Sequence, residues 1–370
     1  MPERPTREMI LSGASRRAIA AVLMVTCLAV ILAGGCGVPS GQVGDASVSS
    51  STQESGSEMS AKAASNGTLM LGVMVHLEGW KSETRNRTAF EQHASLVRQY
   101  ADIFEKCGLR LTLEASPEFT QGCARWGDNV LKEMAERGHA VGLHADLGAE
   151  PGLTQQEFAA GLSRMKGDIE SLGVPVRHVS GICSSLDWVK AAEDAGFEFV
   201  TGTVEYALKS IPADRLPAEY KDVLTARTPL EGHGNVPHEL ADRLHPWRMA
   251  SGADWLWNNP EGNVVIIPGD GGTCIPWMAE AAGGSATGPR TAFTVDDVAA
   301  FTRELDKALG CADPDKINAL YVGWSIGQQV DPAVVEAWAQ AIRTYIDSGK
   351  AQWNSLTEMY DAYVDWETAR

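Results

Sequence analysis

The chain has 370 residues, of which 44% are apolar and 21% charged, and its formal net charge is −17. This apolar content excludes a disordered chain, and the acidic balance makes nucleic acid an unfavourable partner because phosphate backbones are repelled. The length beyond the N-terminal segments is enough for one large folded domain.

The first 35 residues have the pattern of an export signal. Arginines up to Arg17 precede the uncharged run Ala18–Leu32, and small residues lead to Cys36. This order predicts a lipoprotein-type signal peptide over residues 1–35 and lipidation of Cys36. We therefore expect an exported protein on the outer face of a bacterial cytoplasmic membrane, attached to the membrane only through its lipid. An uncleaved membrane anchor and plain secretion are the alternatives.

Residues 36–67 are predicted to form a flexible tether. Gly37–Gly67 contains nine Ser, five Gly and no Leu, Ile or aromatic residue, so it cannot bury a core. The folded domain is then 68–370. Because residues 1–35 carry four Arg and two Glu, the mature chain has a net charge of −19 and is more acidic than the precursor.

From residue 68 onward, short β-rich runs alternate with helical segments. Strands are predicted at Leu69–His76, Arg110–Glu114, Ala140–His144, Val176–Val179, Glu198–Val200, Val264–Ile267 and Ala319–Val322, with a short one at Ala351–Trp353. Most are continuous apolar runs, as in a parallel sheet that is covered on both faces. This rhythm favours an α/β barrel of about seven parallel strands, with a doubly wound open sheet as the alternative.

Local signals mark helix starts and one long insertion. Capping boxes that begin at Thr88, Thr154 and Ser355 each predict a helix N-terminus. Thr203–Gly262 breaks the alternation of strand and helix, and we interpret it as an insertion over one face of the domain.

Polar residues end two of the predicted strands, at the edge where the sites of parallel barrels lie. His76 and Glu78 stand two residues apart at the end of the first strand, and His144 and Asp146 stand two residues apart at the end of the third. Side chains two residues apart on a strand point the same way, so each pair presents a nitrogen and an oxygen to one point. Such a set favours a divalent transition metal, zinc first, over hydrogen-bonded structural histidines.

Two further carboxylates and several tryptophans are candidates for the same site. Glu114 ends the second strand and Asp270 follows the sixth, and either could serve as general base on a water at the metal. Indole rings could stack on sugar rings, with packing under the insertion as the alternative. The tryptophans assigned to substrate binding are Trp247, Trp257, Trp277 and Trp324.

One part of the chain resembles the polysaccharide deacetylase (NodB-homology) family. The run Gly138-His139-Ala140-Val141-Gly142-Leu143-His144, then Gly173-Val174-Pro175-Val176-Arg177 and Ala195-Gly196-Phe197, carries the resemblance. It covers Leu69–Val204 and, more loosely, Gly349–Tyr360. The resemblance implies an irregular (β/α) barrel, a divalent metal held by one Asp and two His, and removal of acetyl groups from chitin-like or peptidoglycan sugars.

The family's motifs are only partly present. By the resemblance, His144 matches the first metal His and Glu78 falls on the metal Asp. The second metal His would fall at Gly148, the catalytic-base Asp at Leu77, and the late His of the general acid at Trp324. These three departures concern the residues that ordinary family chemistry needs.

Two outcomes follow from these departures. In the first, His76 replaces the lost His and Asp146 completes the ligand set, so that the protein deacetylates a cell-wall or extracellular polysaccharide. In the second, it binds a glycan without cleaving it. We expect the first, and a glycosidase on a similar barrel is a third possibility.

Overall fold

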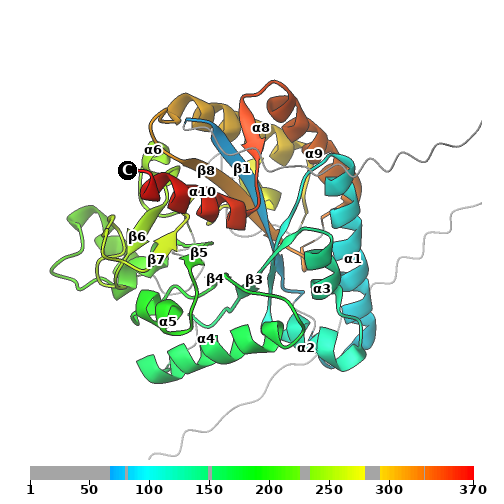
Figure 1. Cartoon of the computed structure of the whole chain (residues 1–370), viewed down its shortest axis with the longest axis horizontal. Helices are drawn as coiled ribbons and strands as arrows, with labels where there is room; N and C mark the ends of the chain where they lie inside the picture. Colours follow the sequence, from blue (N-terminus) through cyan, green and yellow to red (C-terminus); the bar gives the residue numbers. More distant parts are fainter. Residues whose placement is uncertain (1–66, 80–81, 149–151, 226–233, 280–291, 329) are drawn as a thin grey trace, which may run out of the picture. The chain divides into compact units, whose positions relative to one another are not determined.

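The computed structural model describes residues 67–79, 82–148, 152–225, 234–279, 292–328 and 330–370, shown in Figure 1. Its strands are β1 (Leu69–Leu77), β2 (Thr112–Ala115), β3 (Ala140–His144), β4 (His178–Ser180), β5 (Phe199–Val200), β6 (Trp247–Met249), β7 (Val264–Ile266), β8 (Asn318–Ser325) and β9 (Ala351–Trp353). Its helices are α1 (Arg87–Lys106), α2 (Pro117–Trp126), α3 (Val130–Glu136), α4 (Gln155–Glu170), α5 (Trp188–Asp194), α6 (Leu240–Arg243), α8 (Val295–Cys311), α9 (Pro332–Asp347) and α10 (Leu356–Thr368), with 3₁₀ turns η1 (Glu205–Ser210), η2 (Ala218–Thr225) and η4 (Ile275–Trp277). The predicted signal peptide and Cys36 lie outside the described residues. Within the described residues, no helix is long and apolar enough to cross a bilayer.

The strands form one curled, mostly parallel sheet. Their order is β6-β7-β5-β4-β3-β2-β1-β8, and β9 pairs with β1. Only the pair of β6 and β7 is antiparallel among the named strands. Counted from β1, the strands β1, β2, β3, β4, β5 and β7 lie side by side in the order of the chain, and β8 returns to the other side of β1. A doubly wound sheet would instead reverse its strand order in the middle of the sheet. The predicted α/β barrel of about seven parallel strands is confirmed.

The two ends of the curled sheet meet at Tyr321 of β8. The Tyr321 hydroxyl donates a hydrogen bond to the carbonyl oxygen of Ile267 at 2.8 Å. The Tyr321 carbonyl accepts from the amide of Asp270 at 3.0 Å. Gly269, whose φ is +46°, leaves room for the ring, because a Cβ at that position would lie 2.7 Å from it. The segment after β7 therefore closes the barrel against β8.

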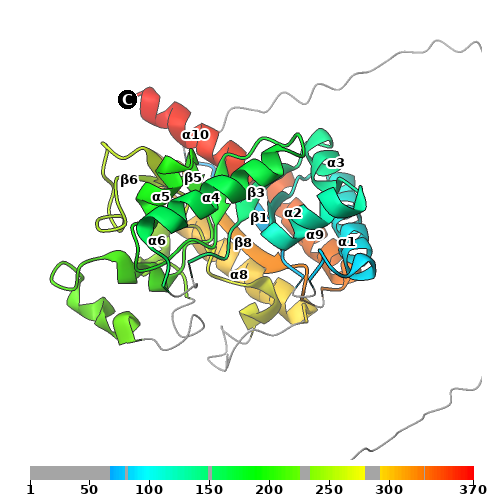
Figure 2. The same ribbon diagram turned by 90° about the horizontal axis from the view of Figure 1, so that it is seen from below.

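Helices cover the outside of the sheet (Figure 2), and their N-termini follow local capping chemistry. The capping boxes that begin at Thr154 and Ser355 start α4 and α10, as predicted. The start predicted at Thr88 is wrong, because the side chain of Asn86, two residues earlier, accepts from the amide of Ala89 and caps α1. Asn is as good an N-cap as Ser or Thr, and the sequence has two candidate N-caps, Asn86 and Thr88, within three residues.

The insertion Thr203–Gly262 contains short 3₁₀ and α segments and one strand that the sequence did not predict. That strand, β6, has three residues and extends the sheet beyond β7. The ring of Trp255 is fully buried and lies edge to face against Trp188, with centroids 5.5 Å apart. Core packing under the insertion is therefore the role of this tryptophan.

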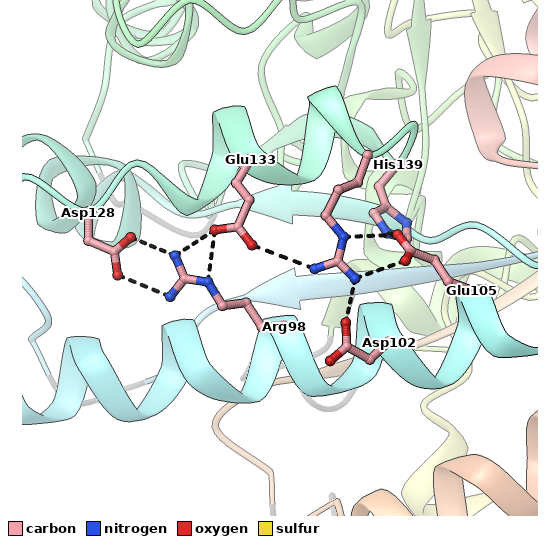
Figure 3. A network of polar contacts seen from close by, with 7 residues as sticks. Arg98, Asp102, Glu105, Asp128, Glu133 and His139 are labelled. Atoms are coloured by element: carbon pink, nitrogen blue, oxygen red, sulfur yellow. Dashed lines mark hydrogen bonds and ion pairs between the residues drawn. The ribbon is translucent and has the colours of Figure 1, made fainter. Parts of the chain in front are cut away.

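An ion-pair network joins α1 to α3 on the outside of the barrel (Figure 3). Arg98 bonds to Asp128 and Glu133, at 2.6 Å for the shortest contact with each. Arg137 bonds to acids of α1, including Glu105 at 2.9 Å. Networks of this bidentate kind are more stabilising than single exposed ion pairs.

Candidate metal centre

The register of the parallel strands brings the polar residues of the barrel interior together. β1 pairs with β2 so that His76 lies opposite Glu114, and β3 pairs with β4 so that His144 lies opposite Ser180. Residues paired across a parallel sheet point to the same face. Each imidazole therefore receives a polar neighbour from the next strand.

Three of the predicted ligands come together at the carboxyl ends of β1 and β3. His76, Glu78 and His144 each offer a ligand atom, and these atoms lie within 4.8 Å of one another, the one such group of three among the described residues. The two imidazole rings stack with centroids 3.8 Å apart and planes at 19°. Nε2 of His144 lies 3.7 Å from Oε2 of Glu78. Tetrahedral zinc spaces its ligand atoms by about 3.4 Å, so small side-chain rotations suffice, and the donor set fits a zinc-like cation.

A hydrogen bond of His144 and an ion-pair contact of His76 indicate which nitrogen of each imidazole carries the lone pair. The Ser180 hydroxyl donates its single proton to Glu114, so it accepts from Nδ1 of His144, at 2.8 Å. That leaves the lone pair of His144 on Nε2, the atom nearest Glu78. Nε2 of His76 lies 3.1 Å from the Glu114 carboxylate, which favours a proton there and a lone pair on Nδ1.

Glu114 is a fully buried carboxylate beneath both imidazoles. Besides Ser180, it accepts from the hydroxyl of Thr201 and lies 3.3 Å from Nε2 of His178. Burial by itself raises the pKa of this carboxyl, but the hydrogen bonds and charge of His178 and His76 outweigh burial and hold its pKa well below the usual range. An ionised acid at this depth favours a cation above it.

A cavity of about 270 Å³ opens above the three candidate ligands, near the lower end of the usual size range for small-molecule sites. Much of its wall has no side chain, because Gly181, Gly202, Gly271, Gly272 and Gly323 line it. The other lining residues include Asp146, Tyr206, Cys274 and Trp324. The cavity can therefore admit a ligand close to the backbone at the ends of several strands.

In sequence, the chain matches no protein-family model and no curated protein. In structure, it is similar to a protein described as a polysaccharide deacetylase from Mycobacterium smegmatis, at 11% identity and a TM-score of 0.50, over 83% of this chain and 96% of that one. A protein from Pseudomonas aeruginosa PAO1 with the same description is 11% identical, with a TM-score of 0.51 over 80% and 91%. Puue allantoinase is 12% identical, with a TM-score of 0.50 over 80% and 91%. The chain has the polysaccharide deacetylase fold.

Within the deacetylase fold, this chain leaves no room for a side chain at one expected ligand position and offers a candidate ligand at another. The second metal His of the family resemblance would fall at Gly148, where a Cβ would lie 2.1 Å from the carbonyl oxygen of Cys183. No side chain fits there without movement of the backbone. The second imidazole of the present group comes instead from His76 on β1. Leu77, at the family's catalytic-base position, is fully buried.

The remaining predicted carboxylates lie at different distances from this centre. Asp146 lines the cavity but stands outside the group of three close ligand atoms. Its φ of +45° is unusual for a residue other than Gly. Asp270 is 2% exposed, accepts a hydrogen bond from Arg243 at 2.6 Å and lines a separate small cavity. Burial raises the pKa of Asp270, because its effect outweighs that of the Arg243 charge. Glu114 lies below the cavity rather than in its wall.

The predicted tryptophans divide between two places in the fold. Trp324 lines the cavity above the candidate ligands but is 2% exposed. Trp247 and Trp257 line another cavity, at the far end of the barrel. Trp277 lies in η4, and its side chain is outside the described part of the structure.

Sequence reasoning missed the polar residues that contact the candidate ligands. His178 and Ser180 repeat on β4 the alternation seen at the ends of β1 and β3, and Thr201 follows β5. That alternation was a usable signal. The sequence gives no signal that Glu114 lies close to His178, Ser180 and Thr201, because this closeness depends on how neighbouring strands are paired.

Proposed function

We propose that the protein is a metal-dependent hydrolase that removes acetyl groups from a cell-wall or extracellular polysaccharide. One observation carries the proposal. His76, Glu78 and His144 hold ligand atoms within 4.8 Å of one another at the mouth of a barrel with the deacetylase fold. Two imidazoles and one carboxylate leave a coordination position open, as catalytic zinc sites do.

The side chains around the cavity have complementary roles. A divalent cation held by the three ligands would polarise an acyl carbonyl and stabilise the charge that develops on its oxygen. Glu114 and Ser180 hold the two imidazoles in their ligand tautomers. Asp146 is the accessible carboxylate of the cavity wall, apart from the ligand Glu78, and is our candidate for the proton acceptor.

Tyr206 is a candidate hydrogen-bond donor to the substrate. It lines the same cavity as Asp146. Burial, with the nearby charge of Asp146, raises the pKa of its phenol, so the hydroxyl keeps its proton at neutral pH. A protonated phenol can donate to a carbonyl or sugar oxygen.

We further propose that the enzyme works outside the cytoplasm as a lipoprotein. The support is the signal pattern that ends at Cys36 and the Ser- and Gly-rich tether that follows it. Cells that express the wild-type chain should incorporate radiolabelled palmitate into it, and the Cys36→Ala chain should incorporate none. Equal labelling of both would contradict this part of the proposal.

The test of activity is acetate release from acetylated chito-oligosaccharides and from acetylated peptidoglycan. Wild-type protein purified without chelator should contain about one equivalent of metal and release acetate. His144→Ala should lose both metal and activity, and Asp146→Asn should keep the metal but lose most of the activity, since general-base catalysis contributes about 10²- to 10⁴-fold. Absence of metal in the wild type, or equal metal in His144→Ala, would contradict the metal centre.

Glycan binding without turnover is the second candidate, and the burial of Leu77 where the family has its base is the observation that favours it. Wild-type protein that binds the oligosaccharides and metal but releases no acetate would establish this function instead. New reducing ends would indicate a glycosidase.

A further inference from the structure

A second cavity, of about 370 Å³, lies at the opposite end of the barrel from the candidate metal centre. Ile317, immediately before β8, lines this second cavity, whereas Ser325, the last residue of β8, lines the first. A strand rises about 3.3 Å per residue, so these two residues are about 25 Å apart. β6 and α10 contribute to its walls and lie side by side (Figure 1), joined by an ion pair of Arg248 and Glu367 at 2.7 Å.

An exposed indole marks this cavity. Trp257 is 60% exposed and, among the described large apolar side chains, only Val295 is similarly exposed. The ring of His238 lies 4.9 Å from that of Trp257 at 56°, and Nε2 of His238 is tied to the carbonyl of Leu256 at 2.9 Å. The indole thus contacts the fixed His238 ring and presents apolar surface to solvent.

A third indole, besides those of Trp257 and Trp247, reaches the same cavity from a distant part of the sequence. Trp366 of α10 lines it, and Nε1 of this residue donates to the carbonyl of Asp315 at 2.9 Å. The guanidinium of Arg370 lies 4.3 Å from the centroid of the Trp366 ring. Three indoles therefore border one cavity, and those of Trp247 and Trp366 are fixed by hydrogen bonds from their Nε1 atoms.

Polar side chains complete the lining. Asp242, Asn258 and Lys316 are exposed and supply acceptors and donors at the rim. Oδ1 of Asn258 accepts from the amide of Arg248 at 3.0 Å, which orients the side-chain amide. One acid, one amide and one amine give no large net charge. Aromatic planes beside mixed hydrogen-bonding groups match a pyranose ring, which has an apolar C–H face and hydroxyls around its edge.

We propose that this cavity is a second carbohydrate-binding site, in which a sugar unit of a glycan polymer stacks on Trp257. The ligand class follows from the side chains of this cavity, and its agreement with the substrate class rests on the proposed function. Two sites on one chain raise the effective concentration of polymer at the metal centre, provided that the polymer spans both. Short oligosaccharides of a few units are too short to do so.

The test is affinity electrophoresis of the full chain in gels that contain glycol chitin, an acetylated polymer. To remove the contribution of the metal centre, every variant carries His144→Ala. The parent variant should be retarded. Trp257→Ala should bind about tenfold more weakly, Trp257→Phe should keep part of the affinity, and Val295→Ala, the matched loss of an exposed apolar side chain, should bind like the parent.

Other outcomes would overturn the proposal. Equal retardation of Trp257→Ala and Val295→Ala would show that the indole binds no sugar. Loss of dimers in Trp257→Ala with unchanged retardation would assign the cavity to contact with a second copy of the chain. Failure of the proposed function is a separate result. If the wild-type protein releases no acetate but Trp257→Ala is still retarded less than the parent, the second carbohydrate site is supported and the deacetylase activity is not.

Discussion

The carboxylate of Glu114 lies 3.1 Å from Nε2 of His76 and, through the hydroxyl of Ser180, also holds His144. The pairing of β1 with β2 places the first two residues opposite each other, and the pairing of β3 with β4 does the same for the second two. One buried anion therefore orients both imidazoles of the candidate metal centre. A carboxylate behind a histidine ligand fixes its tautomer and makes it a stronger base.

Replacement of Glu114 by Gln should weaken metal binding without removing a ligand. We expect the zinc affinity to fall about 10- to 100-fold, since the amide carries no charge and cannot accept from every neighbour at once. A competition titration of the purified chain against a chromogenic zinc chelator measures this directly. The matched control is Asp297→Asn, which removes a carboxylate buried to 1% exposure in the cap of α8, far from β1 in sequence. Equal affinities for Glu114→Gln and the control would contradict the positioning role.

Zinc should also stabilise the folded chain. A ligand at 100 times its dissociation constant adds about 2.7 kcal/mol to the free energy of unfolding if it binds only the folded state. Thermal denaturation should therefore show a higher midpoint with zinc than with a chelator in the wild type, and no difference in His76→Ala. A shift of the same size in both proteins would place the zinc elsewhere.

Much of the fold could be predicted from the sequence because its signals are local. Apolar runs located the parallel strands, and the alternation of His76 with Glu78 located two candidate ligands at the end of β1. Strand β6 has only three residues and depends on its partner β7, so no local pattern marks it. Glu114 showed the right phase, but its depth below the cavity depends on the curvature of the sheet.

Gly148 should tolerate no side chain. A Cβ there would lie 2.1 Å from the carbonyl oxygen of Cys183, so Gly148→Ala should destabilise the fold by about 1 to 3 kcal/mol through overpacking. Gly167→Ala in α4 is the matched control, because nothing lies within 4 Å of its Cβ and Ala is the better helix former by about 1 kcal/mol. Urea denaturation of both variants gives the comparison. A Gly148→Ala variant as stable as the wild type would show that the backbone yields at this position.

Neutral His139 should make the fold sensitive to mild acid. Burial lowers the pKa of His139 to about 4, against about 6.5 in an unfolded chain, although Glu105 opposes the shift. Between these values the unfolded chain binds a proton that the folded chain does not, so the stability that His139 contributes at neutral pH is lost as the pH falls from 6.5 to 4, by up to about 3 kcal/mol. His139→Asn can still accept from the amide of Leu111, which bonds to Nδ1 in the wild type at 3.0 Å, but cannot titrate. Urea denaturation across this range should therefore show a smaller fall for the variant, whereas parallel curves would mean that another group carries the pH dependence.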